Sequence, residues 1–200
     1  EIISRQSSPI SRQAFAHVYQ QIYLAIDKLI RDIPPFPYGL IGISLAVRGI
    51  IDLDGVIRFI PKLQWHNIDI KSLLEQRYHV PVYIDNDGNL AASMESRLHP
   101  QYEELTVLCI TDVISCGMIS NGQLIRGYLG FANAVGHHTI NIQETKQCSC
   151  GKFGCWEQYC SDQYLIDEMN LHLETPLEDI DEFIGIINTI TQDHPILVDK

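Results

Sequence analysis

The chain has 200 residues, 46% of them apolar, a length that suits one domain or two small ones with a buried core. Its 25 acidic residues outnumber its 14 lysines and arginines, and the net charge of -11 excludes nucleic-acid binding through the general surface. Without a run of about 18 apolar residues or a basic leader, we expect neither a membrane span nor a signal peptide. Since the cysteines do not form a disulfide-rich pattern, we expect a reducing compartment, the cytoplasm. Because Glu1 is no initiator residue, we interpret the chain as a fragment.

Helical and strand-like patterns alternate along the first half of the chain. Apolar residues recur at helical spacing over 12–31, and the nearly continuous apolar run over 39–47 is typical of a strand covered on both faces. Asp54 and Gly55 have turn chemistry, and Asp69 is a predicted helix N-cap. The predicted elements are helices over 12–31, 69–77 and 89–98, two short strands within 49–59, and strands over 39–47 and 80–84. This alternation predicts an α/β fold.

A change of composition near His99 and Pro100 predicts a boundary between two parts of the chain. We therefore expect a first α/β lobe over 1–102 and a second over 103–200. Asn121 and Gly122 predict a tight turn between two strands of the second lobe. The predicted elements of this lobe are strands over 106–110, 116–120 and 123–126, followed by helices over 156–173 and 177–191.

Three cysteines lie close together in the second lobe, at Cys148, Cys150 and Cys155. Glycines between them allow the chain to fold back, so that three thiolates face one point. A tetrahedral structural zinc site is commonly Cys3His, and His137, which follows a glycine, is the predicted fourth ligand. The alternative is a set of buried thiols or a disulfide, which the tight clustering disfavours. We therefore expect Zn2+ as the cofactor.

The segment from Cys148 to Glu157, preceded by Gly136 and His137, resembles the signature of the ROK family of sugar kinases and transcriptional repressors. The resemblance extends through the segments 41–52, 63–65 and 85–92 and so covers nearly the whole chain. It implies a ribonuclease-H/actin-like ATPase fold, with two α/β lobes around a sugar cleft and the zinc loop in the second lobe. It also implies a homodimer.

The resemblance implies a role for four residues of the sugar site. In family kinases, a carboxylate at the position of Asp87 deprotonates the sugar hydroxyl, and groups at the positions of Asn86, His137 and Glu157 bind the sugar by hydrogen bonds. All four residue types are present in this chain. Taken alone, Asn-Asp-Gly before a helix is more often a turn or a helix cap, and only its combination with the zinc loop favours a site.

The chain departs from the family pattern at three positions and also lacks one family motif. The glycine-rich phosphate turn of the kinases corresponds here to residues 111–117, where one glycine remains and Asp112 adds a negative charge. Ala134 stands in place of a sugar-binding glutamate, and Arg48 stands where the family often has proline. We interpret Arg48 as a solvated loop cation in preference to a residue that recharges the cleft. The Asp-x-Gly-x-Thr phosphate motif of the family does not occur in the chain.

These features predict the effector and dimerisation domain of a ROK-family transcriptional regulator, with no catalytic residue and Asp87 as the remnant of a base. DNA binding is expected through an N-terminal helix-turn-helix outside these residues, and a sugar is the expected effector. The first alternative is an ATP-dependent sugar kinase with an unusual nucleotide loop. The second is a degenerate ROK scaffold that acts through protein partners, as an antirepressor does.

Overall fold

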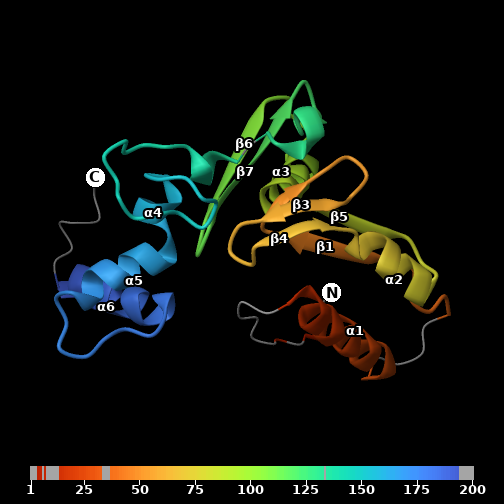
Figure 1. Ribbon diagram of the computed structural model, residues 1–200, viewed down its shortest axis with the longest axis horizontal. Coiled ribbons are helices and arrows are strands. Elements are labelled where there is room, and N and C mark those ends of the chain that lie inside the picture. The colour runs from red at the N-terminus through yellow and green to blue at the C-terminus, as the bar shows by residue number, and fades with distance from the viewer. Residues whose placement is uncertain (1–3, 6, 8–13, 33–36, 133, 194–200) are drawn as a thin grey trace. The chain divides into compact units, whose positions relative to one another are not determined.

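The computed structural model describes residues 4–5, 7, 14–32, 37–132 and 134–193, and side chains only up to residue 188 (Figure 1). The chain divides into two compact units. The first unit consists of residues 1–107 and 116–134, and the second of 108–115 and 135–200. Among the described residues, no helix is long and apolar enough to cross a membrane.

The first unit begins with an α/β arrangement of short elements. Its elements before residue 100 are α1 (Phe15–Asp32), β1 (Ile43–Val47), β2 (Ile50–Ile51), β3 (Ile57–Ile60), β4 (Trp65–Ile68), α2 (Ile70–Tyr78), β5 (Val82–Asn86) and α3 (Asp87–Leu98). The helix predicted over 12–31 is thus confirmed from residue 15 onward, and its predicted start lies outside the described residues. Asp69 is the N-cap of α2 as predicted, since its side chain accepts a hydrogen bond from the backbone N–H of Ser72.

Strands β1 and β5 run parallel, with Ile43 opposite Val82 and Val47 opposite Asn86. Both strands therefore end at the same edge, where the residues after Val47 and the start of α3 come together. Ligands of open α/β folds bind at the carboxyl ends of parallel strands, so this edge is the natural place for a site in the first unit.

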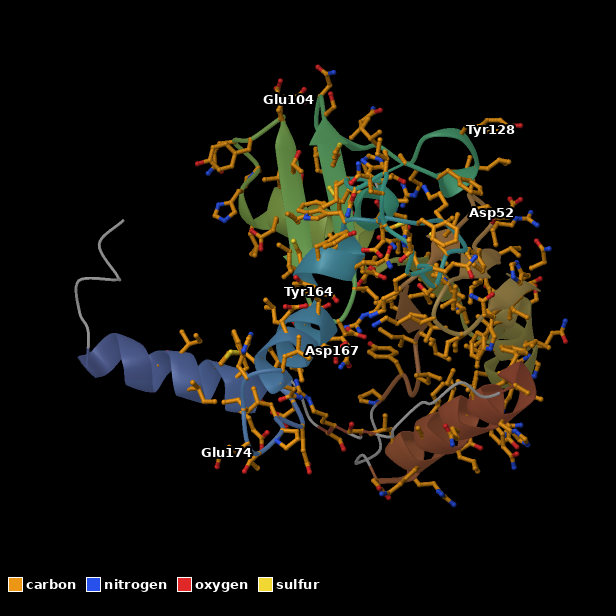
Figure 2. All side chains as sticks on the ribbon, turned by 60° about the vertical axis from the view of Figure 1, so that its left-hand side comes forward. Asp52, Glu104, Tyr128, Tyr164, Asp167 and Glu174 are labelled. Atoms are coloured by element: carbon orange, nitrogen blue, oxygen red, sulfur yellow. The ribbon has the colours of Figure 1, made fainter. Side chains whose placement is uncertain are left out.

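Strands β2, β3 and β4 form a small antiparallel sheet in that order. The turn predicted at Asp54 and Gly55 joins β2 to β3, and Gly55 has a φ of 84°. Asp52, which Figure 2 labels, stabilises this turn. Its Oδ1 accepts hydrogen bonds from the N–H groups of Asp54 and Val56, at 3.0 and 2.9 Å. Its Oδ2 lies 2.6 Å from an Nη of Arg58.

The core of the first unit lies between α1, α2 and the strands. Its buried members are Val18, Ile51, Ile57, Ile60, Trp65, Ile70, Leu74 and Val82. The ring of Phe15 packs edge-on against Trp65, with ring centroids 5.2 Å apart. On the surface, Asp27 of α1 accepts hydrogen bonds from Arg77 and Tyr78 of α2 and so joins the two helices.

The apolar run over 39–47 differs from its prediction. Only residues 43–47 form a strand, and along β1 half-buried residues alternate with exposed ones. Ile41, just before the strand, is 77% exposed. The reason is that only one face of β1 is partly covered, whereas Ser44 and Ala46 on the opposite face are exposed.

A second sheet has the order β6 (Leu105–Ile110), β7 (Ile114–Ser120) and β8 (Gln123–Leu124). The predicted turn at Asn121 and Gly122 joins β7 to β8, whose residues pair antiparallel. Helix α3 approaches β7 very closely, because a Cβ on Gly117 would lie 2.1 Å from the carbonyl oxygen of Gly88. Two glycines therefore allow α3 to pack against this sheet.

The remaining elements are short helices. They are η1 (Tyr128–Gly130) of the first unit and η2 (Val135–His137), α4 (Glu157–Cys160), α5 (Asp162–Asn170) and α6 (Ile180–Asp193) of the second. The single helix predicted over 156–173 is wrong, because the chain leaves the helical conformation at Ser161, with φ -77° and ψ 158°. The side chain of Ser161 then caps α5 by accepting a hydrogen bond from the N–H of Tyr164, which Figure 2 labels.

Candidate functional site: a Cys3His centre and a polar strand end

The predicted zinc ligands His137, Cys148, Cys150 and Cys155 come together in the second unit. Their donor atoms all lie within 4.8 Å of one another. His137 ends η2, and Cys155 lies two residues before α4. A tight turn carries the other two cysteines, since the N–H of Cys148 donates to the carbonyl of Lys152 at 2.8 Å and the N–H of Gly151 to that of Cys148 at 2.9 Å.

Gly154 is required by the packing of this loop. A Cβ at this position would lie 1.7 Å from the carbonyl oxygen of Asn141, and the φ of Gly154 is 67°. The N–H of Ile140 also donates to the carbonyl of Gly154, at 2.7 Å. The glycine spacing seen in the sequence therefore brings the segment after His137 against the segment that carries Cys155.

The donor geometry fits a tetrahedral metal ion. Cys148 Sγ lies 3.6 Å from His137 Nδ1, and Cys150 Sγ lies 3.6 Å from Cys155 Sγ. With zinc–sulfur bonds of about 2.3 Å, the edge of a tetrahedron is about 3.8 Å. Both distances are close to this edge, and all four donor atoms lie within 4.8 Å of one another. Free cysteines with no disulfide between them agree with this interpretation.

Burial shifts the pKa values of the histidine and of two of the thiols in opposite directions. Burial, together with the charge of Lys152, lowers the pKa of His137, so the imidazole is neutral and able to act as a ligand near neutral pH. Burial and the neighbouring thiols raise the pKa of Cys148, and they raise the pKa of Cys155 to about 12. Crowded, buried thiols ionise only when a positive ion balances their charge.

Glu157, a predicted sugar-binding residue, begins α4 and is 7% exposed. Its Oε2 accepts a hydrogen bond from the backbone N–H of Ile114 at 3.1 Å. Ile114 begins β7 and lies within residues 111–117, the segment that the resemblance matches to the phosphate turn of family kinases. The carboxylate is therefore connected to that turn within the second unit.

Asn86 and Asp87 lie at the carboxyl end of β5, in the first unit. Asn86 is the N-cap of α3, and its Oδ1 accepts hydrogen bonds from the N–H groups of Gly88 and Asn89. Its Nδ2 donates to the carbonyl of Gly49 at 3.0 Å. The structure thus gives Asn86 the capping role that its sequence context favours, which fixes the direction of the side chain.

Two arginines lie beside the acidic residues at this strand end. Arg48 is half-exposed, as expected for a solvated cation. Its Nε also lies 3.7 Å from Asp87 Oδ2, so it forms an ion pair at this strand end. Arg126 donates to Asp85 Oδ2 at 2.6 Å, and Asp85 is itself buried. Sequence reasoning missed this second pair. The signal was a charged residue at the end of an apolar strand, a position where burial demands a partner.

The structure therefore brings the metal ligands together with Glu157 in one unit, and Asn86 with Asp87 in the other. Each group is described within its own unit. The first unit supplies a polar strand end with two carboxylates and two guanidinium groups. The second supplies a Cys3His group that could hold a metal ion and, two residues after Cys155, the buried carboxylate of Glu157.

The chain belongs to the ROK family. The model of this family matches residues 1–190. The xylose repressor of Bacillus subtilis (strain 168) is 40% identical over 146 residues, covering 72% of this chain and 38% of the repressor. A glucokinase of Halalkalibacterium halodurans is 30% identical over 165 residues, covering 80% of this chain and 50% of the kinase. The chain thus spans between 38% and 50% of the length of these curated relatives.

Solved structures of the family have a similar fold. A ROK family glucokinase from Streptomyces griseus, in complex with glucose and AMPPNP, has a TM-score of 0.69 and 25% identity, covering 78% of this chain and 49% of the kinase. A ROK family transcriptional regulator, a homolog of the E. coli MLC protein, has a TM-score of 0.61 and 20% identity, covering 82% and 44%. The α/β class is confirmed, and these neighbours have the ribonuclease-H/actin-like fold that the resemblance implied.

Proposed function

We propose that the chain is the effector and dimerisation part of a ROK-family transcriptional regulator, which responds to a sugar without phosphorylating it. The relatives named xylose repressor support the regulator class, and they make xylose the first candidate effector. The observation that carries the proposal against a kinase is the state of the turn between β6 and β7.

Backbone groups of this turn form hydrogen bonds with other groups of the protein. The N–H and the hydroxyl of Thr111 both donate to the carbonyl of Val113, at 3.0 and 3.2 Å. The N–H of Ile114 donates to Glu157, and the carbonyl of Thr111 accepts from the N–H of Asp162. Phosphoryl transfer depends on N–H groups aimed at the phosphates, and here two of them already have acceptors. The negative charge of Asp112 opposes phosphate further.

The residues proposed to bind a sugar are Asn86 and Asp87 in the first unit and His137 and Glu157 in the second. Nδ1 of His137 faces the thiolates, so its Nε2–H is the group that would donate to a sugar hydroxyl. Ala134 lacks the carboxylate of the family pattern. A charged hydrogen bond contributes about 1.5–3 kcal/mol, so its loss weakens the binding of family sugars about tenfold to a hundredfold.

The Cys3His centre is proposed to hold one structural Zn2+ ion. The four protein donors fill a tetrahedral ion and leave no position for substrate, so the ion would order the loop and take no part in chemistry. We further propose a cytoplasmic homodimer that binds DNA through a helix-turn-helix outside these 200 residues. The repressor relatives support the DNA-binding role.

Two measurements test this function. A coupled assay for ADP should detect no ATP-dependent phosphorylation of xylose, glucose, N-acetylglucosamine or N-acetylmannosamine by the full-length protein. Measurable turnover would favour the sugar-kinase alternative, which the similarity to glucokinases supports. Calorimetric titration with xylose and aldohexoses then separates a sugar-responsive regulator from a scaffold that acts only through protein partners. Weak binding that Ala134→Glu strengthens would support the regulator, whereas no binding by either form would favour the scaffold.

A further inference from the structure

Helix α4 is attached to both arms of the metal loop through one side chain. The Oε1 of Gln158 accepts a hydrogen bond from the N–H of Cys155 at 3.0 Å. Its Nε2 donates to the carbonyl of Lys146 at 2.9 Å. Lys146 lies two residues before Cys148, so a single carboxamide connects the segment entering the loop with the segment leaving it.

A second side chain of α4 binds the same entering segment. The hydroxyl of Tyr159 donates to Glu144 Oε2 at 2.5 Å, and it accepts from the Nδ2 of Asn141 at 3.0 Å. The other oxygen of Glu144 accepts from the N–H groups of Thr145 and Lys146, at 2.8 and 2.7 Å. The segment from Asn141 to Lys146 is thus folded around the tyrosine hydroxyl.

We propose that Asn141, Glu144, Gln158 and Tyr159, here named the loop clasp, are positioning residues that hold the metal ligands in place and increase the affinity for zinc. The proposal rests on the proposed zinc site. The clasp touches no ligand atom directly, but it holds the backbone at Lys146, two residues before Cys148, and at the N–H of Cys155. Groups that orient metal ligands in this way typically contribute tenfold to a hundredfold to metal affinity.

The clasp also connects the metal centre with the proposed sugar site. Glu157 directly precedes Gln158 on α4, and its carboxylate accepts the hydrogen bond from the N–H of Ile114. When the clasp is intact, the position of this carboxylate depends on the metal loop. Loosening the clasp should therefore expose the Ile114 amide to faster hydrogen exchange in the zinc-loaded protein.

Two variants test the clasp, with one matched control. Tyr159→Phe removes the hydroxyl and keeps the ring, whose centroid lies 6.1 Å from that of Tyr164. Gln158→Ala removes the carboxamide. Gln163→Ala is the control, because Gln163 bonds only within α5 in the contacts described, to Asp167 at 2.8 Å. Zinc affinity is measured by competition with a chromogenic chelator, and unfolding of the metal-free protein is measured in parallel.

We expect Gln158→Ala and Tyr159→Phe each to weaken zinc binding by at least tenfold, with faster exchange at Ile114, while Gln163→Ala stays within twofold of the wild type. If the wild type binds zinc and both clasp variants bind it with the same affinity, the proposed role of the clasp is refuted, but the metal site is not. If the free energy of zinc binding and the free energy of unfolding of the metal-free protein fall by the same amount, the role of the clasp is purely structural and the proposal is also refuted. Wild-type protein that binds no zinc would refute the metal site itself.

Discussion

Replacing Cys150 by serine removes one of the four donors while nearly preserving the volume of the side chain. Cys150 Sγ lies 3.6 Å from Cys155 Sγ in the group of four donors, and its loss leaves three donors at three corners of an incomplete tetrahedron. Since the ion would connect the end of η2, the cysteine turn and the start of α4, its loss should release all three segments. We expect a less stable second unit.

The size of the effect follows from metal linkage. An ion present at about a thousand times its dissociation constant stabilises the folded state by about 4 kcal/mol. For a unit of about 60–100 residues, each kcal/mol shifts the unfolding temperature by roughly 4–8 °C, so the loss should be about 15 °C or more. Scanning calorimetry of the zinc-loaded protein, with and without excess chelator, measures this shift.

The matched control is Cys109→Ser. Cys109 is a half-buried free cysteine on β6, outside the Cys3His group. This variant should retain the zinc and the response to the chelator, whereas Cys150→Ser should unfold at the same temperature with and without chelator. If Cys150→Ser instead unfolds like the wild type and still responds to the chelator, the four-donor site is wrong.

Three further predictions concern the first unit. Leu74→Ala should cost about 2–5 kcal/mol in urea denaturation, because Leu74 is 0% exposed, and Leu73→Ala, at a 37% exposed position, should cost clearly less; similar losses would contradict the packing. Gly117→Ala should lower the melting temperature, because the new Cβ would lie 2.1 Å from the oxygen of Gly88; an unchanged melting temperature would contradict this close approach. Burial acts to raise the pKa of Asp52, but hydrogen bonds outweigh this effect and the pKa is lowered. The ionised carboxylate therefore stabilises the protein near pH 7, and this contribution disappears as the pH falls from about 4. Asp52→Asn should therefore reduce the loss of stability between pH 7 and pH 3, and an unchanged pH dependence would refute this.

Local chemistry allowed much of the fold to be predicted from the sequence. The cap at Asp69, the turn at Asp54 and Gly55, and the turn at Asn121 and Gly122 each depend on residues within a few positions of one another. The Cys3His group was also predictable, because three of its members lie within eight residues and the fourth follows a glycine. Such short-range patterns specify geometry without knowledge of the remaining chain.

The features that sequence reasoning missed depend on contacts between distant residues. The pair of Asp85 with Arg126 joins positions 41 residues apart, and although the strand end indicates that Asp85 needs a partner, no local pattern indicates which residue it is. The contact of Arg48 with Asp87 follows from the parallel register of β1 and β5, which sets the residues after Val47 and Asn86 side by side. The break at Ser161 was missed because apolar periodicity continues through it, although a serine is a common helix cap.

The two-lobe division at residue 102 and the sugar-binding roles of Asn86, Asp87, His137 and Glu157 stay predictions. Asn86 illustrates why the sequence is not enough, since the same side chain can cap a helix and bind a ligand. Its oxygen accepts two backbone hydrogen bonds, and its nitrogen donates to the carbonyl of Gly49. Substitution of Asn86 would therefore change both the start of α3 and any sugar contact.

The most direct test of the regulator assignment is the release of ADP by the full-length, zinc-loaded protein in the presence of ATP and xylose or glucose. If the turn at residues 111–117 no longer holds a nucleotide, ADP should form at the rate of the protein-free control, while a ROK glucokinase assayed in parallel turns over glucose. Sugar-dependent ADP release above the control would contradict the account and identify the chain as part of an active sugar kinase.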